Sequence, residues 1–523
     1  MKTFRRRAGT PLVRTCVPAL LLFALLFSGC DGAPEAESPP DAPSTPTPTA
    51  SAPPVQPTGE ETLTSVLDRD GSDGYTGDLV LVYHPALSDA AKKTMGSLDG
   101  LVETTENRVP TREGTYLKTS GLYSEPDPFL TDAIRQADPC YELTGGDLWQ
   151  VGFPHVFNVG AGCPDEMLFQ VSAVGERCRV WSPVNPDYGP LEGLDPAYPD
   201  QLAREMDHAI PVLEQTFGPI PDIRGDGKMN ILCFDCDLSA PLGWTDPKDI
   251  YDDLSVNGTV LRGNRLPIVI INTAPLIQGV NSDLSQLFYT STVHEMAHSI
   301  YGAQHIQGGS FSTSKAWTFF TEFLAVAAQE TVYPGSSISH SLPWWYSDKT
   351  VWEDLAADDA GLYLRDKNNQ RQSGCSIFDW GSTREDYSLA LLLAHFVENR
   401  GGTDAFAHLE NGGGTQLYEV LSLIWEELGY EDYAAFAEDF LLSVLLHEED
   451  GPYRLRPFQG YDPAQCGGEE NPFSHLAPII TDKGIYIRPG GYAVVRPVGG
   501  VYYPPATAAE GLCYVGISWK AAG

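Results

Sequence analysis

His294-Glu295-Met296-Ala297-His298 is a His-Glu-x-x-His motif near the middle of the chain. It lies in residues 283–304, whose apolar pattern predicts a helix. On a helix, residues i and i+4 share one face, so both imidazoles can reach one metal ion. Glu295 projects beside them and could hold a water molecule at that ion. The motif therefore predicts a zinc site with His294 and His298 as ligands.

A catalytic zinc ion takes three protein ligands and leaves one position for water. Glu322 lies in the apolar run 317–325, which predicts a second helix, and a carboxylate is costly to bury there without a cation partner. His305 is the rival ligand, because Gly302 and His305 follow the motif in the metzincin order, although each falls one position too late. No methionine follows Met296, so the metzincin Met-turn cannot form. Glu322 is therefore the preferred third ligand.

The two histidines followed by Glu322 on a second helix resemble the gluzincin metallopeptidases, and within them most of all the hyicolysin family. Over about residues 160–450, further stretches are similar to that family's landmarks: Gly175-Glu176-Arg177-Cys178-Arg179-Val180-Trp181, Gly225-Asp226-Gly227-Lys228, Thr290-Ser291-Thr292-Val293, and the segment from Tyr387 to Gly402. The chain departs from the family beside the ligand, where Thr321 and Phe323 stand in place of the frequent Asn and Gly. The resemblance implies a two-lobed zincin fold with its cleft between an α/β lobe and a helical lobe.

The resemblance also implies a zinc metallopeptidase that hydrolyses a protein or peptide substrate. Glu295 would be the general base on zinc-bound water and would then pass the proton to the leaving amine. In several gluzincins a tyrosine from the helical lobe stabilises the oxyanion. Tyr387, at the start of a predicted helix, is the candidate, and a packing role is an equal alternative. Tyr301 is close to the motif along its helix and is less favoured.

The predicted fold class is α+β, with a zincin-like two-lobed catalytic domain over residues 146–449. Small β-rich regions precede it at 60–145 and follow it at 450–523. Apolar runs predict strands at 78–83, 179–181, 229–234 and 266–271, and helical spacing predicts helices at 202–217, 317–330, 387–398, 417–428 and 433–447.

The N-terminus is typical of a bacterial lipoprotein precursor. Basic residues at 5–7 precede an apolar run, 17–27, that is too short to span a bilayer. Phe27-Ser28-Gly29-Cys30 resembles a lipobox, which makes residues 1–29 a signal peptide and Cys30 the lipidated residue. An ordinary cleaved signal is the alternative. Residues 30–59 are rich in Pro, Ser and Thr and predict a linker. We expect the protein in the cell envelope, with the membrane as a partner through the lipid.

The net charge argues against one class of partner, and the cysteine content bears on disulfide formation. The formal net charge is −37, and a surface so acidic repels phosphate backbones, so no nucleic-acid partner is expected. An even number of cysteines in an exported chain favours disulfides, up to four. The eight cysteines beyond Cys30 are Cys140, Cys163, Cys178, Cys233, Cys236, Cys375, Cys466 and Cys513.

Two other functions are compatible with the sequence. One is a catalytically inactive zincin-fold lipoprotein with a binding or adhesion role, and another is a zinc hydrolase of a non-peptide bond. The loop Asp222-x-Arg224-x-Asp226-Gly227 partly resembles a calcium loop, but arginine at its third position is unsuitable as a ligand. A plain turn is preferred there, and Ca²⁺ is only a weak second cofactor candidate.

Overall fold

The computed structural model describes part of the chain in detail. Residues 1–65, which hold the predicted signal peptide, Cys30 and the linker, lie outside this part. The described residues are 66–68, 74–85, 115–116, 149–159, 166–184, 197–222, 225–235, 242–250, 253–256, 259–262, 264–273, 284–308, 315–337, 363–365, 371–373, 384–411, 417–464, 470, 472–475, 480–481, 487, 491–504 and 512–518.

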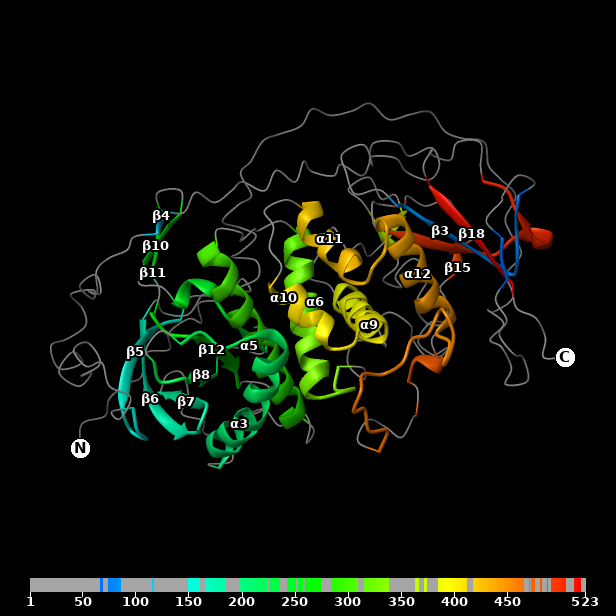
Figure 1. Ribbon diagram of the computed structural model, residues 1–523. Helices are drawn as coiled ribbons and strands as arrows, with labels where there is room; N and C mark the ends of the chain where they lie inside the picture. Colours follow the sequence, from blue (N-terminus) through cyan, green and yellow to red (C-terminus); the bar gives the residue numbers. More distant parts are fainter. Residues whose placement is uncertain are drawn as a thin grey trace, which may run out of the picture.

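A six-stranded sheet forms one end of the molecule (Figure 1). Its strands lie in the order β5-β6-β7-β8-β12-β9; β7, β8 and β12 are parallel, and the other neighbours are antiparallel. Val180 and Trp181 of β7 lie in different apolar clusters, as alternation along a strand requires. The sheet is therefore buried on both faces. The bounds are β5 Pro154–Asn158, β6 Glu166–Val174, β7 Cys178–Pro183, β8 Met229–Phe234, β9 Gly243–Trp244 and β12 Ile268–Asn272.

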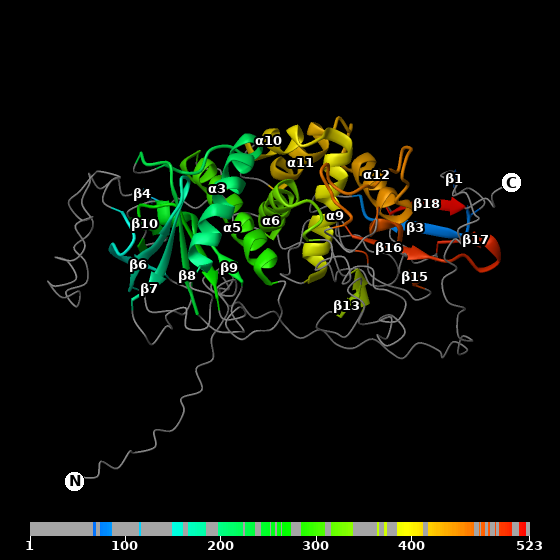
Figure 2. The same ribbon diagram turned by 90° about the horizontal axis from the view of Figure 1, so that it is seen from below.

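Two helices, α3 (Tyr198–Phe217) and α5 (Leu284–Gly308), cover one face of this sheet (Figure 2). α3 contacts β6 and β7, and α5 contacts β12. The apolar spacing predicted α3 from residue 202, but it begins earlier because Pro199 is accepted in a first turn, where its missing N–H is not needed. It ends at Gly218, whose φ of 94° favours glycine.

The helices that follow form the middle of the molecule. α6 (Lys315–Val332) contacts both α5 and α9 (Arg384–Gly401). Asp432 caps α12 by accepting a hydrogen bond from the backbone N–H of Ala435 at 2.9 Å. The bounds of the remaining helices are α10 Asp404–Asn411, α11 Leu417–Glu427 and α12 Tyr433–Leu446. The prediction of a mixed α and β protein, compatible with α+β, is thus confirmed.

The far end of the molecule is a sheet built from both ends of the described chain (Figure 1). Its strand order is β1-β18-β3-β16-β15, so the early strand β3 is central and pairs antiparallel with the late strands β16 and β18. The predicted boundaries treat 60–145 and 450–523 as separate regions, whereas this sheet joins parts of both. The bounds are β1 Val66–Asp68, β3 Leu79–Tyr83, β15 Ile480–Thr481, β16 Tyr492–Val495 and β18 Cys513–Ser518.

Several short elements complete the structure. β10 (Asp253–Val256) pairs with β11 (Thr259–Arg262) and with β4 (Thr115–Tyr116). Two further pairs are β2 (Tyr75–Thr76) with β17 (Val501–Tyr502), and β13 (Tyr363–Arg365) with β14 (Arg371–Ser373). Single 3₁₀ turns are η5 Pro247–Ile250, η6 Pro472–His475 and η7 Val498–Gly500.

Three cysteines in the described part of the chain carry free thiols. Cys178 and Cys233 are buried, and Cys513 is half-buried. Burial raises the pKa of the Cys178 thiol to about 12, so this thiol is inert at neutral pH. The five other cysteines after Cys30 lie outside the described residues, and a disulfide among them stays a prediction.

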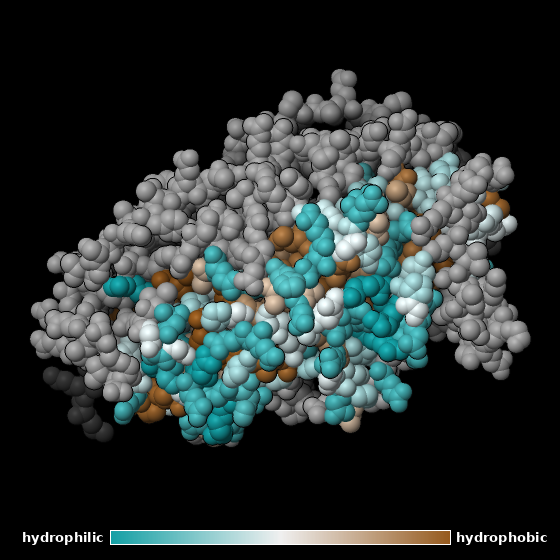
Figure 3. Space-filling model, viewed as in Figure 1, coloured by the Kyte–Doolittle hydropathy of each residue, from teal (hydrophilic) through white to brown (hydrophobic). Residues whose placement is uncertain are grey.

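The coloured surface is mainly hydrophilic, including the exposed sides of α3 and α12 (Figure 3). Among the described residues, no helix is both long enough and apolar enough to cross a bilayer.

Candidate metal centre

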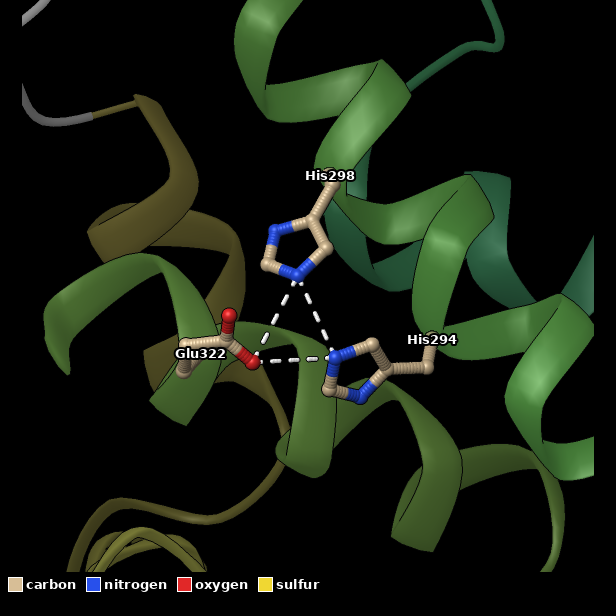
Figure 4. A group of neighbouring side chains, drawn as sticks. All are labelled: His294, His298 and Glu322. Atoms are coloured by element: carbon tan, nitrogen blue, oxygen red, sulfur yellow. Dashed lines mark hydrogen bonds and ion pairs between the residues drawn. The ribbon is translucent and has the colours of Figure 1, made fainter. Parts of the chain in front are cut away.

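Two imidazoles and one carboxylate converge where α5 meets α6. His294 and His298 lie one turn apart on α5, and Glu322 comes from α6 (Figure 4). His294 Nε2 is 3.0 Å from Glu322 Oε2 and 3.2 Å from His298 Nε2, and His298 Nε2 is 3.6 Å from Glu322 Oε2. These three residues are the one group among the described residues whose donor atoms could hold a metal ion.

The geometry of this triad fits zinc. Tetrahedral coordination with bonds of about 2.0–2.2 Å places neighbouring donor atoms about 3.3 Å apart. The three observed separations, from 3.0 to 3.6 Å, lie around that value. Two imidazole nitrogens with one carboxylate oxygen are also a donor set typical of catalytic zinc. The residues therefore fit the metal that the sequence motif predicts.

The charges at the triad favour a cation. Burial lowers the pKa of His294, but the hydrogen bond and charge of Glu322, together with the charge of Glu295, outweigh it and raise the pKa to about 9. Burial also raises the pKa of Glu322, but His298 and His294 hold it well below its usual range. The ionised carboxylate of Glu322 therefore stabilises a positive charge placed between it and the two imidazoles.

Gln329 is a site residue that the sequence reasoning missed. Its Oε1 lies 3.2 Å from His294 Nδ1, the ring nitrogen that does not contact Glu322 or His298. The available signal was its position seven residues after Glu322, which places both on one face of α6. No motif includes it.

Glu295 lies against β9, the last strand in the order of the described six-stranded sheet. A Cβ atom on Gly243 would stand 2.9 Å from Glu295 Cγ, so only glycine allows this close approach. The backbone N–H of Thr245, just after β9, donates to the Glu295 carboxylate. Burial raises the pKa of Glu295, while the charges of His294 and His298 oppose the rise. Glu295 is thus a fixed, buried carboxylate beside the two histidines.

The structure brings Tyr387 to the same site. It is half-buried on α9, and its ring centroid lies 6.2 Å from that of His294, with 47° between the ring planes. Tyr301 is buried in the core, where its ring contacts Phe320. Of the two tyrosines considered from the sequence, Tyr387 is therefore the one beside the metal-binding residues.

Two weaker candidates from the sequence are His305 as a zinc ligand and the loop 222–227 as a calcium site. His305 lies on α5, but its side chain is outside the described residues; the third donor brought to the two histidines is Glu322. In the calcium-like loop, Asp222 Oδ1 accepts the backbone N–H groups of Gly225 and Asp226. Asp226 Oδ2 pairs with Arg179 at 2.7 Å. Since both carboxylates serve the turn before β8 and an ion pair, the arrangement does not favour Ca²⁺.

Comparison of the sequence with protein-family models and with curated proteins finds no match. The candidate site therefore depends on its own geometry, and membership of the gluzincins or of the hyicolysin family stays a prediction.

Proposed function

We propose that this protein is a zinc-dependent metallopeptidase of the gluzincin type, similar to the hyicolysin family. The observation that carries the proposal is the convergence of His294 Nε2, His298 Nε2 and Glu322 Oε2 beside the buried carboxylate of Glu295. The order of helices α5 and α6 behind a mixed sheet supports a zincin-like fold with an α/β lobe and a helical lobe.

Each residue has a distinct role in the proposed reaction. A bound zinc ion would supply Lewis acidity to a carbonyl oxygen and would lower the pKa of water. Glu295 takes a proton from the attacking water and later gives it to the leaving amine, a task suited to a carboxylate whose pKa is raised by burial. Tyr387 donates a hydrogen bond from its hydroxyl to the developing oxyanion.

The edge of the sheet supports a peptide as the substrate. β9 ends the strand order of the described sheet and pairs on one side with β12. No described strand pairs with its other side, which could bind an extended chain through backbone hydrogen bonds. Because β9 also lies against Glu295, a bound peptide would pass directly over the metal-binding residues. A substrate with a peptide backbone uses this edge, whereas a small non-peptide substrate does not.

The proposed location is the bacterial cell envelope. The lipobox-like sequence ending at Cys30, followed by the Pro-rich linker, supports attachment to the membrane through a lipid. The acidic composition argues against a nucleic-acid partner.

A peptide library tests the function directly. The protein is purified from residue 31 onward, and cleavage of a diverse library is read by mass spectrometry with zinc, with a chelator, and with zinc restored after the chelator. The proposal predicts cleavage that the chelator abolishes and zinc restores. Cleavage that persists in the chelator would contradict a metallopeptidase. Zinc binding without any cleavage would favour the inactive binding protein, and turnover of an ester library alone would favour a non-peptide hydrolase.

A further inference from the structure

His294 makes contacts through both of its ring nitrogens. Nε2 faces Glu322 Oε2 and His298 Nε2, and Nδ1 faces Gln329 Oε1 at 3.2 Å. Since the ring is buried, its two nitrogens depend on these neighbours rather than on water.

A metal ion held by His294 would determine which ring nitrogen carries the proton. A neutral imidazole has one N–H and one lone pair, and the lone pair must point at the metal. With Nε2 as the donor to the metal, Nδ1 carries the hydrogen and needs an acceptor. Gln329 places its amide oxygen 3.2 Å from Nδ1, where it can accept a hydrogen bond from an Nδ1–H group.

The end of α6 holds Gln329 in position. Its neighbour Glu330 is fully buried, and the Glu330 carboxylate accepts the backbone N–H groups of Gly335 at 2.7 Å and Ser337 at 2.9 Å. Glu330 Oε2 also lies 3.4 Å from Nε2 of the buried His395 on α9. These contacts fix the Glu330 carboxylate in the last turn of α6. The neighbouring Gln329 brings its Oε1 to 3.2 Å from His294 Nδ1.

We infer that Gln329 is a positioning residue that selects the metal-binding tautomer of His294. The inference depends on the metal centre of the proposed function. One face of α6 then supplies both a metal donor, Glu322, and the group that orients a second donor. The amide does this as a neutral acceptor, without adding charge to the site.

Zinc affinity of three variants tests this role, measured by competition with a chromogenic chelator and without any substrate. Gln329→Leu keeps a similar volume but removes the acceptor, and its affinity should fall about 10-fold to 100-fold. Gln329→Glu keeps an acceptor and should bind zinc at least as tightly as the wild type. Gln304→Leu is the matched control, because Gln304 lies on α5 and donates to Phe217 O at 3.3 Å. Its zinc affinity should not change.

The melting temperature of each metal-free variant separates positioning from folding. Lost affinity in Gln329→Leu with a melting temperature near that of Gln304→Leu, and recovery in Gln329→Glu, would support the inference. Wild-type affinity in Gln329→Leu would overturn it and leave the proposed function intact. If Gln329→Leu does not fold, Gln329→Glu decides alone, since weakened zinc binding there would also overturn the inference. A wild-type protein that binds zinc but cleaves no peptide would refute only the proposed function.

Discussion

The ring of Tyr387 lies beside that of His294. We therefore expect the Tyr387 hydroxyl to donate a hydrogen bond to the oxyanion. Tyr387→Phe keeps the ring and its packing but removes the donor. If the hydroxyl stabilises the oxyanion only in the transition state, kcat should fall roughly 10²-fold to 10³-fold. KM and zinc content should stay near those of the wild type. The measurement is steady-state kinetics on a peptide from the library, with metal analysis of the same sample.

A packing role for Tyr387 predicts a different pattern. Thermal stability would fall, while kcat per zinc-loaded molecule would be largely kept. Near-normal kcat in Tyr387→Phe would therefore remove the hydroxyl from the proposed mechanism.

Zinc affinity should depend on pH through His294. The pKa of His294 is raised to about 9 in the metal-free protein, so at neutral pH a proton occupies the position that the metal must take. Below pH 9 the apparent affinity should fall about tenfold for each unit of acidification, because binding releases about one proton. Chelator competition between pH 6.5 and 8.5 measures the slope. Affinity that does not change over this range would contradict the proposed protonation of His294.

Single site residues could be predicted only where the neighbouring sequence indicates their role. Glu322 could be predicted, since an acid in an apolar helix needs a cation and the two histidines supply a metal site. Gln329 could not, because glutamine is common on helices and its contact with His294 depends on how α5 and α6 cross. Tyr387 was predicted from the resemblance, and its distance from His294 agrees with a position at the site.

Among the elements, α5 and β9 pack against each other, with Glu295 of α5 beside Gly243 of β9. In Gly243→Ala the new Cβ would stand 2.9 Å from Glu295 Cγ and 3.2 Å from Ile270 O, so Glu295 must move. A displaced base costs activity steeply, on the order of 10²-fold for about 1 Å. We expect kcat to fall on that scale while zinc content stays normal, since Glu295 is not among the three donor residues.

Metal analysis is the control for Gly243→Ala. Lost zinc would mean that the substitution disturbs the whole centre, and unchanged kcat would mean that β9 does not position the base. The strand itself could not be predicted, because two residues are too few for strand periodicity. By contrast, the longer apolar run at 229–234 coincides with β8.

In the molecule as a whole, β3 joins the N-terminal part of the chain to the C-terminal part by pairing with β16 and β18. The side chains of β3 are all buried, and Leu81 is 0% exposed. Leu81→Ala should lower the free energy of unfolding by about 2–5 kcal/mol, the range for such a change in a core. Val151→Ala is the control, because Val151 is 66% exposed and should change stability by less than about 0.5 kcal/mol. Chemical denaturation followed by circular dichroism compares the two.

An unchanged stability in Leu81→Ala would mean that the terminal sheet is not part of the cooperative core. The sequence showed the strand itself but not its partners. β3 pairs with strands more than 400 residues later, and pairing over such a distance leaves no local pattern. One sheet therefore contains strands from both of the predicted terminal regions, 60–145 and 450–523.

In the proposed enzyme, His294, His298 and Glu322 hold a catalytic zinc ion while Glu295 acts on water. The most direct measurement is zinc content by mass spectrometry together with peptide cleavage, on Glu295→Gln and Glu322→Ala prepared alongside the wild type. We expect about one zinc per chain and no cleavage for Glu295→Gln, and loss of both zinc and cleavage for Glu322→Ala. Full zinc content in Glu322→Ala, or loss of zinc from a folded Glu295→Gln, would contradict these roles.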